Sequence, residues 1–166
     1  LTNIGDYAFR LNLICNYQLP STIQTIGDYA FVDADAIETI NIPANTSIGA
    51  GAFWACNNLK KVVLGEGCTF RSNVYYYYLN STSGSSLTGY NTFSACKSLE
   101  EVVFPTTWYK ISNTNMLNGC TSLKKVTFKS PTLIDGSQYN TFFVFIGELM
   151  RITNLGQNIK KCLILL

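Results

Sequence analysis

Apolar residues recur along this chain in the order apolar-x-x-apolar-x-apolar, and the same order returns several times. The last four positions of each segment alternate in polarity and are rich in β-branched side chains, which is typical of a short strand with one buried face. Proline directly follows several of these segments, and since it lacks a backbone donor we expect it to end the strand. The pattern predicts parallel strands at Ile40–Ile42, Val62–Leu64, Val102–Phe104 and Val126–Phe128.

A second signal is an internal repeat. The hexapeptide IGDYAF occurs twice, and the equivalent residues Ile4, Ile26 and Ile48 are each 22 residues apart. A period of this length indicates that each repeat is one stacked supersecondary unit, here with one strand in each coil. Gly27 and Gly49 recur beside the isoleucines, and we expect them where a Cβ would crowd the backbone. One apolar position marks about six repeats, at Phe9, Phe31, Phe53, Phe93, Leu117 and Phe142. Of these, Phe31, Phe53, Phe93 and Phe142 are expected to stack in the interior.

The third repeat is longer than the others, because 40 residues separate Phe53 from Phe93. We place an insertion at residues 71–88, which begins with tyrosines and continues with Ser, Thr and Gly, a composition of turns and connections. Tyrosine offers a large contact area and a hydroxyl group at low entropic cost, so the segment either covers the edge of the core or forms a contact surface. The candidate binding residues in it are Tyr75, Tyr76, Tyr77 and Tyr78.

These columns together resemble the leucine-rich repeats of the BspA type, whose pattern is roughly I-G-x-x-A-F-x-x-C-x-x-L-x-x-V-x-L-P. The match is closest from Ile26 to Val103. The asparagine ladder of the better-known leucine-rich repeat is missing, and Cys56, Cys96 and Cys120 occupy a turn position that faces the core instead.

The resemblance implies a leucine-rich repeat right-handed solenoid of the α/β class, with mostly short parallel strands and irregular or short helical turns. It implies a single domain over residues 1–166, expected to be a segment of a longer solenoid. It further implies a secreted or cell-surface protein that serves adhesion or partner binding, and the family offers no catalytic residues to carry over.

Residues between the inward positions of the strands are expected to face the concave side. One such column sets Glu101 between Lys61 and Lys125, which we interpret as a solvated ladder of ion pairs. The next column places Val63 beside Val103, a modest apolar patch of the kind that can mark an interaction site. Lys61, Val63, Glu101 and Val103 are therefore candidate binding residues alongside the four tyrosines.

Composition narrows the classes of partner. Only 13% of residues are charged, the net charge is +2, and basic residues occur at most two in a row, which argues against nucleic acid. No apolar run approaches the roughly 18 residues of a membrane-spanning helix, so we expect no membrane insertion. Histidine is absent, so a Ser-His-Asp or Cys-His arrangement cannot be built in its usual form.

The remaining chemistry-bearing residues are cysteines and paired carboxylates. Six cysteines leave three possibilities open, namely buried thiols, at least one disulfide, or a metal site; the shared column of three favours thiols. Among the carboxylates, Asp33 with Asp35 lies in a turn, and Glu100 with Glu101 is expected to point to opposite faces of a strand.

The sequence thus predicts no enzyme, no cofactor and no metal. The leading hypothesis is a non-catalytic module that binds a protein or glycan ligand, and the alternative is a structural spacer within a larger surface protein.

Overall fold

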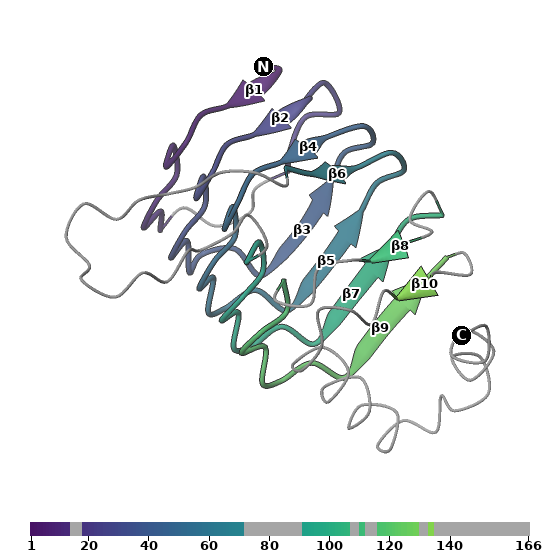
Figure 1. Cartoon of the computed structure of the whole chain (residues 1–166). Coiled ribbons are helices and arrows are strands. Elements are labelled where there is room, and N and C mark those ends of the chain that lie inside the picture. Colours follow the sequence, from purple (N-terminus) through teal and green to yellow (C-terminus); the bar gives the residue numbers. More distant parts are fainter. Residues whose placement is uncertain (14–17, 72–90, 107–109, 112–115, 130–132, 135–166) are drawn as a thin grey trace, which may run out of the picture.

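The chain winds into a solenoid of parallel strands whose coils stack along one axis (Figure 1). The structure, a computed structural model, describes residues 1–13, 18–71, 91–106, 110–111, 116–129 and 133–134. No helix occurs in these ranges, so irregular turns connect the strands that the structure describes. The predicted solenoid of parallel strands is confirmed.

One face of the solenoid is a four-stranded parallel sheet. Its order is β3-β5-β7-β9, and Ile40, Val62, Val102 and Val126 are partners in successive strands. In β3 and β5 buried and more exposed residues alternate, so the apolar pattern is the inward face of the sheet. The four predicted strands are confirmed, each starting one residue earlier than expected: β3 (Thr39–Ile42), β5 (Lys61–Leu64), β7 (Glu101–Phe104) and β9 (Lys125–Phe128).

The prediction of one strand in each coil was wrong, because a second set of strands exists. It forms the parallel sheet β1-β2-β4-β6 and a separate parallel pair of β8 and β10. Each of these strands has only two residues, so the sequence shows no alternation of polarity from which the strand could be predicted. Their bounds are β1 (Asn3–Ile4), β2 (Thr25–Ile26), β4 (Ser47–Ile48), β6 (Thr69–Phe70), β8 (Lys110–Ile111) and β10 (Leu133–Ile134).

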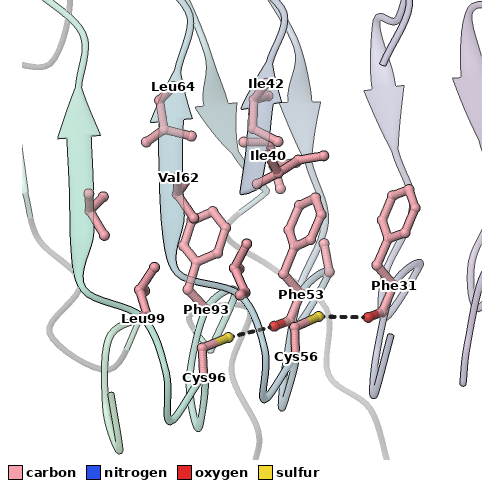
Figure 2. Close-up of a cluster of buried hydrophobic side chains, with 14 of the residues drawn as sticks. Phe31, Ile40, Ile42, Phe53, Cys56, Val62, Leu64, Phe93, Cys96 and Leu99 are labelled. Carbon is pink, nitrogen blue, oxygen red and sulfur yellow. Dashed lines mark hydrogen bonds between the residues drawn. The ribbon is translucent and has the colours of Figure 1, made fainter. Parts of the chain in front are cut away.

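The interior contains a stack of phenylalanine rings from successive coils (Figure 2). Phe9 stacks on Phe31 and Phe31 on Phe53 with ring centroids 5.0 Å apart, and Phe53 lies 5.4 Å from Phe93. These spacings are close to the roughly 4.8 Å between neighbouring strands, so the step from one coil to the next is nearly the same for the rings as for the backbone. Phe31, Phe53 and Phe93 are fully buried, as predicted. Phe142 lies outside the described residues.

Backbone hydrogen bonds tie the turns of one coil to those of the next. The amides of Phe31 and Phe53 donate to the carbonyl oxygens of Ala52 and Thr92, at 2.7 and 2.9 Å. Two residues further on, Ala55 is held in the left-handed region at φ 57° and donates to Ser94 at 2.9 Å. This conformation costs an L-residue on the order of 1 kcal/mol, and the bond to the neighbouring coil helps to offset it. The bond to the neighbouring coil therefore stabilises a backbone corner that would be strained in an isolated coil.

The glycines beside the isoleucines allow the coils to approach. A Cβ on Gly27 would lie 2.4 Å from the carbonyl carbon of Gly5, and one on Gly49 would lie 2.5 Å from that of Gly27. No side chain fits at such a distance, so the expectation for Gly27 and Gly49 is confirmed. The same column continues to Arg71, since Phe70 pairs with Ile48 and keeps the 22-residue period.

Removing one ring tests the stack directly. Phe53→Ala deletes a fully buried ring that has a neighbour on both sides, and should lower the free energy of unfolding by about 3–5 kcal/mol. Phe9→Ala is the matched control, because Phe9 is half-buried and should cost clearly less. Denaturant unfolding followed by circular dichroism measures both, and equal losses for the two variants would contradict the stack.

Candidate functional site

The outward side chains of β3, β5, β7 and β9, called here the outer face, form two regular columns. In the column toward the strand ends, Asn41, Val63, Val103 and Thr127 are partners in successive strands. Val63 and Val103 are half-buried rather than fully exposed, so the apolar patch they form is real but small. Their predicted adjacency is confirmed.

The other column is an ion-pair ladder centred on Glu101. Its carboxylate lies 2.8 Å from the ammonium groups of both Lys61 and Lys125, and its side chain is only 21% exposed. Hydrogen bonds from Lys125 and then Lys61 hold the pKa of Glu101 below its ordinary value. Glu101 is therefore a fixed negative charge between two positive ones, as the sequence predicted.

A second row of charges runs just before the strands. Lys60 pairs with Glu38 and Lys124 pairs with Glu100, both at 2.8 Å. The hydrogen bond with Glu38 raises the pKa of Lys60 above its usual value. These pairs are well exposed and stabilise the fold little, but they alternate in sign from coil to coil. A row of charges of alternating sign therefore lies along the border of the outer face.

The four predicted tyrosines lie outside the described residues, but Arg71, the first residue of the predicted insertion, is described. Arg71 directs its guanidinium to the carboxylate of Asp28, at 3.1 Å, across 43 residues of sequence. Asp28 is buried and also accepts a hydrogen bond from the amide of Ala50 at 2.7 Å. Sequence reasoning missed this contact, although Arg71 stands 22 residues after Gly49 and so belongs to the same column.

The cysteine column is part of the core. Cys56, Cys96 and Cys120 are buried free thiols, which confirms the prediction made for them. Each thiol donates to a phenylalanine carbonyl in the preceding coil: Cys56 to Phe31 at 3.0 Å, Cys96 to Phe53 at 3.1 Å, and Cys120 to Phe93 at 3.1 Å.

Two of these thiols, Cys96 and Cys120, are poorly suited to nucleophilic chemistry. Burial raises the pKa of Cys120 to about 12. The hydrogen bond with Cys56, followed by burial, raises the pKa of Cys96 well above its usual value. The thiolate is the reactive form, so both groups stay protonated and inert at neutral pH. Among the described residues, no group of three or more acidic, histidine or cysteine side chains is placed to hold a metal ion.

The paired carboxylates are structural. Asp35 accepts a hydrogen bond from the amide of Asn57 at 2.7 Å, and Asp33 sits at a corner with φ 55°. The expectation that Glu100 and Glu101 point to opposite faces was wrong. Glu100 precedes β7 and is exposed, so both side chains lie on the solvent side and both are engaged by lysines.

Replacing Glu101 should make stability depend on pH in a defined way. Because the folded pKa of Glu101 is lowered, its contribution is present above the ordinary value of 4.5 and is lost as the pH falls through the folded pKa. Glu101→Gln should therefore cost up to about 1 kcal/mol at pH 7 and less at pH 3. Urea unfolding at both pH values measures this, with Glu100→Gln as the control that removes a single, more exposed pair. A loss at pH 3 as large as at pH 7 would show that the ion pairs are not its cause.

In the part of the chain that the structure describes, no helix is long and apolar enough to cross a membrane. No curated protein matches this chain significantly.

Three solved structures share the fold. A T. pallidum leucine rich repeat protein is 15% identical with a TM-score of 0.61, and the match covers 92% of this chain and 77% of that one. A leucine rich cell surface protein from Faecalibacterium prausnitzii A2-165 is 21% identical, with a TM-score of 0.59 over 86% of this chain. A leucine-rich repeat protein from Bacteroides ovatus ATCC 8483 is 18% identical, with a TM-score of 0.57 over 86% of this chain. This chain spans about a third of the length of the latter two proteins, 32% in each case.

The family model for the BspA type leucine rich repeat region matches in six copies, over residues 1–88 and 77–143. The matched residues include every repeat column described above and extend through the insertion. The chain therefore belongs to the BspA type leucine-rich repeat family.

Proposed function

We propose that this chain is a non-catalytic binding segment of a secreted or cell-surface protein and that it engages a protein ligand through the outer face. The observation that carries the proposal is the half-buried pair Val63 and Val103 beside Glu101, which two lysines hold in place. An apolar centre with a charged border is the usual composition of a protein-binding surface.

The geometry favours a protein over a glycan at this face. The two outward columns of β3, β5, β7 and β9, as described, carry no aromatic side chain on which a sugar ring could stack. The paired charges instead suit a partner of complementary pattern, since charges set partner choice and association rate more than affinity. A glycan ligand would be better served by the tyrosines of the insertion, Tyr75 to Tyr78, which stay a prediction from the sequence.

Surface location is supported by the family and by one structural relative, which is described as a cell surface protein. The segment supplies a rigid display of side chains, because every residue of the outer face is fixed by the sheet register. We therefore propose adhesion or partner recognition as its role.

The alternative is a structural spacer, and one observation favours it. The charged side chains of the outer face largely neutralise one another. Glu101 pairs with two lysines, and the charged side chains along the border pair with each other. A face of this kind has little net field to attract a ligand from a distance.

A binding screen separates the two proposals. The chain would be tested against a panel of purified extracellular proteins and a glycan array, followed by Val63→Glu/Val103→Glu. If the outer face binds, this variant should weaken the dissociation constant at least about tenfold, because a charge replaces each apolar contact at the centre. The Tm and circular dichroism of the variant are measured alongside, because two like charges directly opposite in adjacent strands also destabilise the sheet, and only loss of binding by the folded variant supports the proposal.

Gln24→Glu is the matched control, since it adds a charge at an exposed position away from the four-stranded sheet. A second variant, Tyr75 to Tyr78 replaced by serine, tests the insertion. Loss of binding in the tyrosine variant alone would move the site to the insertion. Failure of the wild-type chain to bind any member of either panel would favour the spacer.

A further inference from the structure

We propose that the outer face binds the outer face of a second copy of this chain, so that the protein ligand is the chain itself. The inference rests on the proposed function, because it needs the outer face to be a binding surface. The two copies would be related by a two-fold axis that runs along the strands, in the gap between β5 and β7. These are the two middle strands of the sheet β3-β5-β7-β9 (Figure 1).

A two-fold axis in this position keeps the direction of the strands and reverses their order. β5 of one copy then faces β7 of the other, and β3 faces β9. Such an interface is isologous, so each contact between different residues occurs twice in the dimer. Residues at the same height along the strands meet, and the register of the sheet therefore determines which side chains face one another.

The charges along the border of the outer face become complementary when the order of the strands is reversed. From β3 to β9 the border residues are Glu38, Lys60, Glu100 and Lys124. Their signs are negative, positive, negative and positive, so the reversed order is opposite at every position. Lys60 of one copy would face Glu100 of the other, and Glu38 would face Lys124. These side chains are between 49% and 68% exposed, so their charged groups are accessible to a partner.

The ion-pair ladder within the sheet is complementary in the same way. Its column reads Thr39, Lys61, Glu101 and Lys125. Lys61 of each copy would face Glu101 of the other, and Lys125 would face Thr39. Each of the two central charges would then have opposite charges beside it in its own sheet and in front of it in the second copy. The dimer therefore forms without breaking the ion pairs of the single chain.

The apolar patch lies on the proposed axis. Its column reads Asn41, Val63, Val103 and Thr127, which is polar at both ends, so reversal leaves the pattern of polarity unchanged. Val63 of each copy would face Val103 of the other, which brings four half-buried valines together at the centre. An apolar centre with a polar rim is the usual arrangement of a protein interface.

The charges and valines together select this arrangement over other ways of placing two outer faces together. A two-fold axis along the solenoid would place each coil opposite the same coil of the second copy, so every charge would face its own sign. An axis that runs along one strand, rather than between two strands, also brings like charges together. Such contacts suppress association. An axis between β3 and β5 keeps opposite signs in contact, but Val63 would then face Asn41 instead of Val103.

The spacing of the charges favours a second copy over an unrelated protein. The signs alternate at the step between neighbouring strands, which is roughly 4.8 Å. An unrelated partner would match them only if its own charges alternated at this step in two parallel rows. A second outer face has this step and both rows, because it has the same sheet.

Sedimentation equilibrium of the wild-type chain tests the proposal, at concentrations up to about 1 mM because an interface of short strands is expected to be weak. A concentration-dependent dimer is expected. Lys61→Glu and Glu101→Lys should each weaken its dissociation constant at least about tenfold, because each variant places two pairs of like charges in the dimer. Gln24→Glu is the matched control outside the four-stranded sheet and should leave the dissociation constant unchanged.

Mixing the two charge variants distinguishes this arrangement from the others. In the mixed dimer, the carboxylate introduced by Lys61→Glu faces the ammonium introduced by Glu101→Lys, and the unchanged residues at these positions also face each other with opposite signs. The mixture should therefore dimerise at least about tenfold more tightly than either variant alone. Circular dichroism checks that both variants fold. Lys60→Glu mixed with Glu100→Lys repeats the test at the border, where the exposed pairs stabilise the fold little.

A wild-type chain that stays monomeric up to about 1 mM would overturn the proposal. A dimer that the charge variants leave unchanged, or that neither mixture restores, would overturn it as well. The chain itself is one member of the protein panel in the binding screen. If the chain is monomeric but Val63→Glu/Val103→Glu loses another protein of that panel, the proposed function stands and only the second copy is excluded. If no protein of the panel binds through the outer face, the proposed function fails too.

Discussion

The structure depends on the contact between equivalent residues of adjacent coils. Phenylalanine stacks on phenylalanine, isoleucine pairs with isoleucine, and the thiols of Cys56, Cys96 and Cys120 donate to the carbonyl group of a phenylalanine one coil away. Since a single coil has no interior of its own, its apolar side chains are buried only by its neighbours. Between the first three coils, the close approach in turn requires glycine at positions 27 and 49. Stability is therefore a property of pairs of coils rather than of any one coil.

This constraint also shapes the surface. The inward positions of the long strands are apolar because stacking buries them, and charges of opposite sign follow one another at the outward positions along the ladder. The buried thiols and the backbone bonds of the corners belong to the packing and supply no chemistry. What remains for the proposed recognition is a rigid grid of outward side chains on the four long strands.

Sequence periodicity predicted most of this fold, because the same packing requirement recurs in every coil. The inward residues of the long strands, the ring stack, the thiol column and the setting of Glu101 all follow from positions that recur together. The two-residue strands were missed because a segment with a single inward isoleucine has no alternation to read. The corner at Ala55 was missed because its positive φ results from bonds to the next coil rather than from a local preference of alanine. The contact of Arg71 with Asp28 becomes visible only once Phe70 is placed in a strand. The site itself could be predicted only as a surface, since no residue type in it dictates a ligand.

The central claim is that turns and sheet are stabilised together by the stack. Native-state hydrogen exchange tests it by comparing the amide of Phe53, which donates to Thr92 in the turn region, with the amides of β5 in the sheet. If the coils open as one unit, both sets should exchange with the same free energy, equal to that of global unfolding. Exchange at Phe53 that is much faster than in β5 would mean that the turns open while the sheet stays formed, and would contradict the account.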